Sequence, residues 1–290
     1  MTQHSGTTPA RPLLSPTDGD RGAVAVPGVL ALGLARTRLE VLQFSRERTS
    51  MVFTFAFPVI LLFIFGSVFK GQTIGGGVDF TQYFTAGMIA SGIVLSSFQS
   101  LAIGIAIERD DGTLKRLRGT PMPPAAYFLG KIGLVLVTSI VQDVVLLGAG
   151  ALLFGLQLPT DPLLWLRFAW VFLLGAAAGT VLGIAYSSVP RSGKSASAVV
   201  SPVVLVLQFI SGVFFVFSQL PAWMQDVSSV FPLRWLAQGM RSVFLPQNFA
   251  GNEVGGSRQL GTTAGVLVAW LVLGLLLCLR TFRWSRVGSG

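Results

Sequence analysis

The chain has 290 residues, of which 52% are hydrophobic and only 11% are charged, and its mean hydropathy is +0.70. A soluble domain carries about 25% charged residues, so this composition excludes an ordinary soluble protein and indicates an integral membrane protein. One histidine, His4, and one cysteine, Cys278, exclude a histidine-based metal site and a disulfide framework within one chain.

The first 26 residues are rich in Thr, Pro, Ser and Gly and contain no apolar run. This composition is typical neither of a secretory signal peptide nor of packed structure, so it predicts a disordered cytoplasmic tail over residues 1–26. Residues 27–48 predict an amphipathic helix, in which Arg36 and Glu40 form an i,i+4 pair within a narrow polar stripe. Such a helix lies along the inner membrane interface or, alternatively, packs on other protein.

Six stretches, uncharged apart from Asp143 in the third, are each long enough to cross the hydrocarbon core, which takes about 20 residues. They predict spans at about 49–69, 83–107, 132–157, 168–189, 199–217 and 259–279. The predicted fold class is therefore an all-α integral membrane protein with six transmembrane helices. Sixteen of the 21 basic residues fall on the side that holds both termini, which orients both termini toward the cytoplasm.

The stretch between the fifth and sixth spans is apolar but divided. Pro221 and Pro232 split residues 220–245 into two pieces that are each too short to cross a membrane. Trp223 and Trp235 suit the headgroup region of the outer leaflet. We expect two short re-entrant helices there, whose ends must be covered by protein.

The only dense group of charges between the first and last apolar stretches follows the second span, at residues 108–131. Asp111 is placed to cap a short helix that begins at Gly112 and Thr113 and stops before Pro121. Leu114 and Leu117 share one face of this helix and are expected to be exposed, docking on lipid or on a partner protein. An ordinary positive-inside loop, which is the alternative, needs no capped helix.

The sequence E-R-D-D-G-T-L-K-R-L-R-G-T-P over residues 108–121, followed by Tyr127 and Leu129-Gly130-Lys131, resembles the cytoplasmic loop of ABC-2 type transporter permeases. The daunorubicin/doxorubicin-resistance branch is the most similar. A second match is Ser211-Gly212-Val213-Phe214-Phe215 with the Leu220-Pro221 that follows it. The resemblance covers roughly residues 27–287, which it assigns to one ABC-2 type transmembrane domain.

This resemblance implies roles for two groups of residues. A coupling helix would dock on a separate ABC nucleotide-binding ATPase subunit, through Glu108, Arg109, Asp111, Gly112, Thr113, Leu114, Arg116, Leu117, Arg118 and Pro121. A re-entrant outer gate would include Pro221, Trp223, Pro232, Trp235 and Arg241. A second permease chain, identical or different, would complete the pathway. ATP and Mg would be bound by the partner ATPase.

Nothing in the sequence predicts that this chain is an enzyme. The Gly193-Lys194-Ser195 fragment lacks the glycine that a phosphate-binding loop requires five residues earlier, because Ser188 stands there. We therefore expect no cofactor and no metal in this chain, and no nucleic acid as a partner.

Residues that could line a transport pathway are Gln99, Asp143, Gln208, Phe214 and Phe215. An ionised Asp in mid-span costs about 2.5–3.5 kcal/mol on insertion scales, so Asp143 should face the bundle or a cavity. It would contact a cationic substrate or form a polar pair with Gln142. In the fourth span, Gly175, Gly179 and Gly183 predict close helix packing.

The leading functional hypothesis is a permease subunit of an ATP-driven exporter in the bacterial plasma (inner) membrane. The resemblance implies an amphiphilic, drug-like or antibiotic-like cargo, with a lipid-linked glycan or glycolipid as the alternative. A proton-driven secondary transporter is the alternative from another class. That class favours internal repeats and several buried ionisable residues, whereas Asp143 is the only such residue within these spans.

Overall fold

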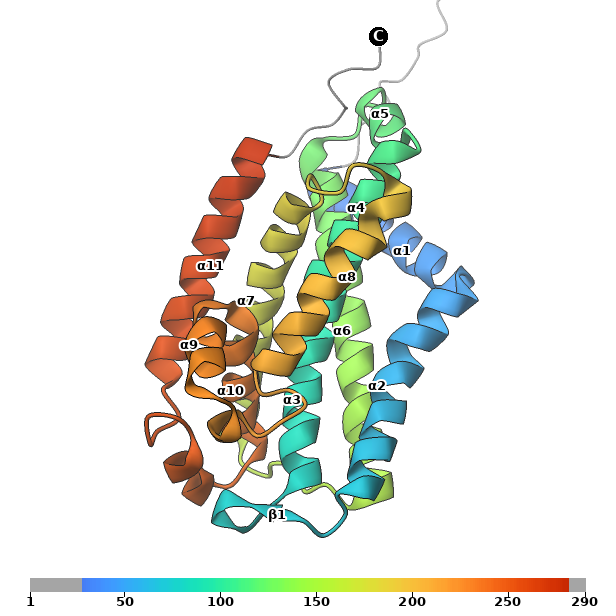
Figure 1. Cartoon of the computed structure of the whole chain (residues 1–290). Coiled ribbons are helices and arrows are strands. Elements are labelled where there is room, and N and C mark those ends of the chain that lie inside the picture. The colour runs from blue at the N-terminus through green and yellow to red at the C-terminus, as the bar shows by residue number, and fades with distance from the viewer. Residues whose placement is uncertain (1–27, 282–290) are drawn as a thin grey trace, which may run out of the picture.

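The computed structural model describes residues 28–281, apart from the side chains of Thr49 and Ser50. The predicted disordered tail at residues 1–26 lies outside the described residues, as do Arg283 and Arg286. Within them, long helices run side by side as one bundle (Figure 1).

Six helices among the described residues are long and apolar enough to cross a membrane. They are α2 (Arg48–Val68), the continuous α3 (Phe80–Val94), η2 (Leu95–Gln99) and α4 (Ser100–Asp110), α6 (Pro124–Phe154), α7 (Pro162–Tyr186), α8 (Gly193–Ile210) and α11 (Leu260–Thr281). This confirms the predicted number of six candidate spans, because an apolar run of about 20 residues can satisfy its backbone in hydrocarbon only as a helix or a closed barrel.

The fifth span differs from its predicted bounds of 199–217. Helix α8 begins at Gly193, where Ser192 and Ser195 form a reciprocal capping box. It ends at Ile210, and Gly212 follows with φ 73°, a left-handed conformation that favours glycine. The chain then turns back so that Phe217 packs against Gly212. The apolar residues after Ile210 therefore belong to a turn that follows the helix and not to the span.

The second span lies at the centre of the bundle, and α6, α7, α8 and α10 all pack against it. Nearly all of α3 is buried, and η2 is a π-helical turn in which the Ser100 hydroxyl donates to the Leu95 carbonyl at 3.0 Å. Such turns are frequent at functional sites. On the α7 side, Gly179 and Gly183 lie against Ser97 and Phe98, which confirms the predicted close packing.

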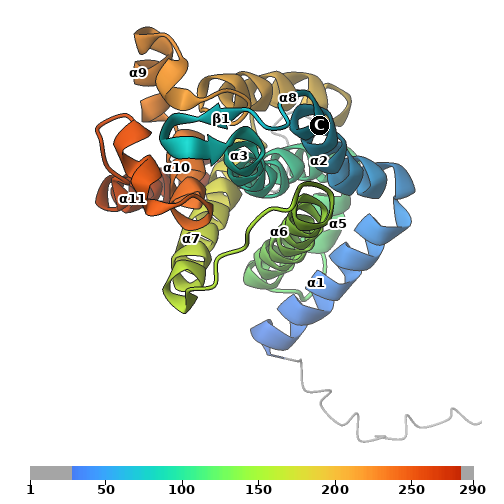
Figure 2. The same ribbon diagram turned by 90° about the horizontal axis from the view of Figure 1, so that it is seen from below.

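Helix α1 (Val29–Arg46) lies beside α6 (Figure 2). Gly130 and Gly133 of α6 leave room for Arg36 and Thr37, so the polar stripe of α1 faces protein. The exposed residues of α1 include four leucines, Leu30, Leu34, Leu39 and Leu42, together with polar residues such as Arg38 and Arg46. Packing on protein is thus confirmed for the polar stripe. The exposed leucines support the interfacial position, which stays a prediction.

The opposite end of the bundle from α5 carries the short elements (Figure 1). A small hairpin, β1 (Thr73–Ile74) with β2 (Val78–Asp79), departs from the all-α expectation; η1 (Gly75–Gly77) forms its turn. Helices α9 (Ala222–Val230) and α10 (Pro232–Phe244) confirm the two short helices predicted between the last two spans. Residues 233–244 of α10 are buried throughout, so protein covers this segment, as the predicted re-entrant position requires.

Candidate functional site

The predicted coupling segment forms the helix α5 (Thr113–Arg118), which lies at the tip of the bundle (Figure 1). The Asp111 carboxylate accepts a hydrogen bond from the Thr113 backbone N–H at 2.8 Å, which stabilises the start of the helix. Gly112 has φ 78° and makes the turn from α4 into α5. At the other end, the Thr120 hydroxyl donates to the Leu117 carbonyl at 2.6 Å.

The two leucines of α5 do not have the predicted exposure. Leu114 is completely buried within this chain, and Leu117 is half-buried against the same apolar core. The expectation of two exposed leucines is therefore wrong, because a six-residue helix held by no other apolar contact needs these side chains to anchor it. The exposed face of α5 is instead cationic, with Lys115, Arg116 and Arg118.

The end of α4 is tied to the turn between α7 and α8. One Nη of Arg109 donates to the Ser187 carbonyl at 2.5 Å, and the Asp110 carboxylate accepts from the Gly193 backbone N–H at 3.0 Å. The Gly-Lys-Ser fragment that starts at Gly193 therefore serves as the N-terminus of α8, in the capping box described above. A displacement of α5 would reach α8 through these contacts.

Four charged side chains and one tyrosine form an ion cluster where α1, α4 and α6 meet, at the α5 end of the bundle. The cluster consists of Arg36, Glu40, Glu108, Tyr127 and Lys131. Lys131 Nζ lies 2.5 Å from a Glu108 carboxylate oxygen and 2.9 Å from one of Glu40. Arg36 pairs with Glu40 at 2.6 Å, and the Tyr127 hydroxyl donates to Glu108 at 2.6 Å.

The ion cluster contains two carboxylates and two cations, so its formal charges cancel. The Lys131 and Glu40 side chains are each only 5% exposed. A buried charge needs such partners, because removing one partner of a buried ion pair destabilises the fold by on the order of several kcal/mol. Glu108 was expected to mark the junction of the second span with the coupling helix. The structure shows that it joins that junction to α1 and α6.

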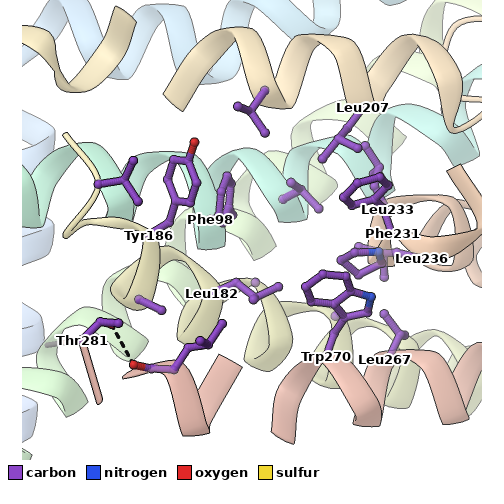
Figure 3. A pocket seen from close by; sticks show the side chains of 18 of the residues that line it. Phe98, Leu182, Tyr186, Leu207, Phe231, Leu233, Leu236, Leu267, Trp270 and Thr281 are labelled. Atoms are coloured by element: carbon purple, nitrogen blue, oxygen red, sulfur yellow. Dashed lines mark hydrogen bonds between the residues drawn. The ribbon is translucent and has the colours of Figure 1, made fainter. Parts of the chain in front are cut away.

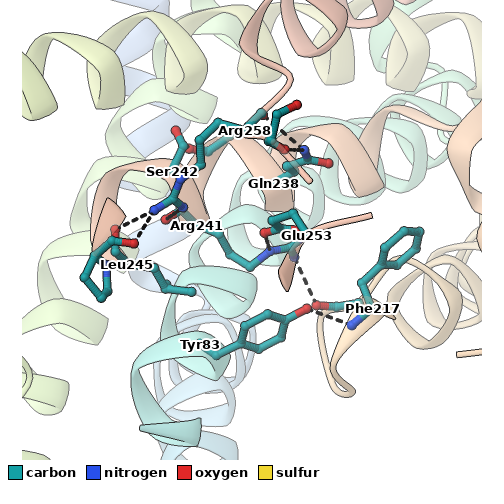
Figure 4. Close-up of polar contacts among 12 residues, drawn as sticks. Tyr83, Phe217, Gln238, Arg241, Ser242, Leu245, Glu253 and Arg258 are labelled. Atoms are coloured by element: carbon teal, nitrogen blue, oxygen red, sulfur yellow. Dashed lines mark hydrogen bonds and ion pairs between the residues drawn. The ribbon is translucent and has the colours of Figure 1, made fainter. Parts of the chain in front are cut away.

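At the other end of the bundle, Arg241 of α10 is fully buried and forms a two-point ion pair with Glu253 (Figure 4). Its Nε lies 2.7 Å from one carboxylate oxygen and its Nη2 lies 3.2 Å from the other. The guanidinium also lies over the Tyr83 ring, whose hydroxyl accepts from the Phe217 backbone N–H at 2.9 Å. This network, called the outer network after its predicted side of the membrane, therefore joins α10, α3 and the turn after α8.

Two further arginines complete the outer network. Arg258 donates to the carbonyls of Arg241, Leu245 and Pro246, at 3.0, 2.9 and 2.5 Å, which satisfies the end of α10. Arg234 lies over the Trp235 ring at 3.8 Å. Burial, together with the positive charge of Arg241, lowers the pKa of Arg234 to about 10, so it stays protonated at neutral pH.

The predicted gate residues lie in two environments. Trp223 is 61% exposed, as a headgroup residue should be, whereas Trp235 is buried and its indole donates to the Ser229 carbonyl at 2.7 Å. The interfacial expectation is therefore wrong for Trp235. Pro221 precedes α9 and Pro232 is the first residue of α10, where each suits the start of a helix.

Two of the predicted pathway residues line one cavity of about 720 Å³ between α2, η2 and α8. Gln99 and Gln208 both face it, joined by Gln142 and Ser201. A second cavity of about 480 Å³ shares Gln99 with it and reaches the ion cluster at Glu40, Glu108 and Lys131. The two cavities therefore adjoin and form a route from the α5 end toward the middle of the bundle, here called the polar route for the Gln, Ser and Thr side chains among its apolar walls.

The other three pathway candidates do not line this route. Asp143 is buried, and neither of its carboxylate oxygens has a hydrogen-bond partner among the described residues. Phe214 packs in an aromatic stack with Phe65 and Phe84, and Phe215 is half exposed on the turn after α8. The predicted polar pair of Asp143 with Gln142 has no hydrogen bond between the two side chains.

A family profile described as ABC-2 type transporter matches residues 34–245. The chain belongs to the ABC-2 type transporter family. It is also 24% identical over 238 residues to the inner membrane transport permease YadH of Escherichia coli K12, which covers 80% of this chain and 86% of the relative. The same values hold for YadH of Escherichia coli O157:H7 and of Shigella flexneri.

Membership in the ABC-2 type transporter family fixes the general role of the chain. It is a transport permease of an ABC transporter, the membrane subunit and not the ATPase. With six candidate membrane-spanning helices and inner-membrane relatives, it is a multi-pass protein of the inner membrane.

Several residues of these sites were not predicted as site residues. Arg36, Tyr127 and Lys131 had been noted only as parts of local patterns, and Glu253 and Arg258 had not been noted for any contact. A usable signal was present for Glu253, because acidic residues are few in this chain and buried arginines require a carboxylate partner.

Proposed function

We propose that this chain is the permease subunit of an exporter that moves an amphiphilic small molecule, of the drug or antibiotic type, out of the cell. A separate ABC nucleotide-binding subunit would bind ATP and Mg and drive the cycle. Both termini and α5 would lie in the cytoplasm, with α9 and α10 at the outer face. The excess of basic residues on the α5 side supports this orientation.

The observation that carries the proposal is the construction of α5. It is a capped helix with a buried leucine anchor, and its exposed face is cationic. A loop that only followed the positive-inside rule would need neither the cap nor the anchor. A projecting helix fixed to its own chain on one side and polar on the other suits a docking contact with a separate protein that bears acidic groups.

Movement of α5 would be transmitted along two connections. Glu108 links the α4–α5 junction to α1 and α6 through the ion cluster, and Asp110 links it to α8 through Gly193. The adjoining cavities lie between α2, η2 and α8. A rigid-body shift of α4 and α8 would therefore change the width of the same route that Gln99 and Gln208 line.

A second permease chain, identical or different, would complete the pathway. The cavity of about 720 Å³ is bordered by exposed apolar residues of α2 and α8, among them Phe53, Phe57 and Leu205. Apolar walls with a few amide and hydroxyl groups suit an amphiphilic cargo, which presents a large apolar surface and few polar groups. The outer network around Arg241 would hold α9 and α10 as the gate at the far end.

The test is to purify the chain with its partner ATPase in proteoliposomes and to follow ATP hydrolysis and export of doxorubicin. Charge reversal on the exposed face of α5, with Arg116→Glu and Arg118→Glu together, is expected to abolish export and cargo-stimulated hydrolysis while the chain stays folded. Lys70→Glu, an exposed cation near the hairpin at the opposite end, is the matched control and should leave both activities unchanged.

Other outcomes distinguish the alternatives. Full hydrolysis and export in the α5 variant would contradict the docking role. Export that stops when the proton gradient is collapsed while ATP is maintained would favour a secondary transporter. ATP-dependent movement of a labelled glycolipid, with no movement of doxorubicin, would assign the cargo to the glycolipid class.

A further inference from the structure

A second kind of cavity lies on the other side of α8 and shares no lining residue with the polar route. It is a groove of about 380 Å³ between α7, α8 and α11, closed from behind by α3 and α10 (Figure 3). Its lining contains no Asp, Glu, Lys or Arg. Val203 and Leu207 line it from α8, whereas Ser201 and Gln208 of the same helix face the polar route.

The groove has a defined length and a closed deep end. Its lining along α11 runs from Leu267 to Thr281, which at 1.5 Å per residue is about 21 Å. That is about two-thirds of a hydrocarbon core roughly 30 Å thick, so the groove is long enough to take an acyl chain of one leaflet. At the deep end the Trp270 ring stacks on Phe231, with centroids 6.2 Å apart, and its indole donates to the Val230 carbonyl at 2.7 Å.

The polar groups of the lining gather at the shallow end. Tyr186 and Thr281 lie at the ends of α7 and α11, and Ser188 follows Tyr186 by two residues; Figure 3 shows Tyr186 and Thr281 toward the same end of the groove. Two exposed cations are near them in the sequence, because Arg280 precedes Thr281 and Arg191 lies two residues after Val189, another lining residue. An apolar slot with cations next in sequence to its polar end has the chemistry of an anionic phospholipid site.

We propose that this groove holds one acyl chain of an anionic phospholipid from the inner leaflet, with its phosphate near Arg191 and Arg280. The end of the acyl chain contacts Phe231 and Pro232, which form the junction between α9 and α10. The lipid therefore fills the space behind the re-entrant segment and supports its position in the bundle. The proposal concerns the resting chain and does not depend on what the transporter carries.

The test is native mass spectrometry of the delipidated full-length chain, titrated with phosphatidylglycerol and with phosphatidylcholine of identical acyl chains. One phosphatidylglycerol per chain is expected to bind more tightly than phosphatidylcholine. Val203→Phe fills the groove and should remove this bound lipid. Val206→Phe is the matched control, because Val206 is 57% exposed on α8 but does not line the groove.

The headgroup contact is tested by Arg191→Gln combined with Arg280→Gln. Each removed cation is expected to weaken phosphatidylglycerol binding about fivefold and to leave phosphatidylcholine binding unchanged. A chain that keeps only Trp270 as its tryptophan should be quenched by phosphatidylglycerol brominated on the acyl chain, and Val203→Phe should reduce that quenching. Equal binding of the two lipids to the wild type would overturn the proposal. So would wild-type binding by both the Val203→Phe and the arginine variants.

Discussion

The two ends of the bundle both rely on ion pairs, but they use them differently. At the outer end, Arg241 and Glu253 are 0% and 2% exposed and form one two-point pair. At the α5 end, Glu108 is 17% exposed and shares its carboxylate among Lys131, Tyr127 and, at 3.9 Å, Arg36. Among the described residues the buried outer pair shares its charges with no other salt bridge, whereas the inner cluster shares its partners and borders a cavity.

This difference indicates different mechanical roles. An isolated buried pair has no alternative partner, so its loss leaves a charge that nothing compensates. The inner ion cluster can lose one contact and keep others, since Glu40 has both Arg36 and Lys131 as partners. A cluster with exchangeable partners suits the end that, in the proposed mechanism, follows a moving ATPase. The outer network suits the element that we propose as the gate, which would keep its shape until it opens.

Glu253→Ala should have the largest effect among the variants that test this difference between the two ends. It leaves the fully buried Arg241 without its carboxylate, and we expect a loss of about 3–5 kcal/mol in the free energy of unfolding. Chemical denaturation of the detergent-solubilised chain measures the loss. Asp226→Ala, which removes an exposed acid on α9, is the control and should change stability little. An equal, small effect of both variants would show that the outer pair is not structural.

The next largest effect concerns the anchor of α5. Leu114→Ala removes a side chain that is completely buried, and we expect a loss of about 2–5 kcal/mol. Leu117→Ala, at a half-buried position of the same helix, should cost clearly less. Thermal unfolding of both variants checks the order. The reverse order would restore the expectation that Leu114 faces a partner protein.

Lys131→Met tests the shared partners of the inner cluster. It removes two ion contacts, yet Arg36 remains near both carboxylates, so we expect a loss of about 1.5–3 kcal/mol, smaller than for Glu253→Ala. Cargo-stimulated ATP hydrolysis should fall more than stability does, because the cluster connects α5 to α1 and α6. Lys131→Arg should restore part of both. Unchanged coupling in Lys131→Met would remove the cluster from the transmission path.

The features that could be predicted from the sequence are local ones. The six spans follow from uncharged runs, the division of α9 from α10 follows from Pro232, and the cap of α5 follows from Asp111. The features that were missed depend on distant contacts. Lys131 meets Glu40 across 91 residues, and whether Leu114 faces its own chain or a partner depends on packing that no local pattern reveals.

Asp111→Ala is expected to give the smallest effect and to separate folding from docking. It removes the carboxylate that accepts from the Thr113 N–H, and loss of such a cap costs about 1 kcal/mol. Leu114 would still hold α5 in place, so global stability should be nearly that of the wild type. Affinity for the ATPase should fall further, because a frayed first turn no longer holds Arg116 in a fixed direction. Asp111→Asn keeps an acceptor for the same N–H, so it should restore binding. If Asp111→Asn binds as poorly as Asp111→Ala, the negative charge itself contacts the partner, and α5 presents a mixed surface to it and not a purely cationic one.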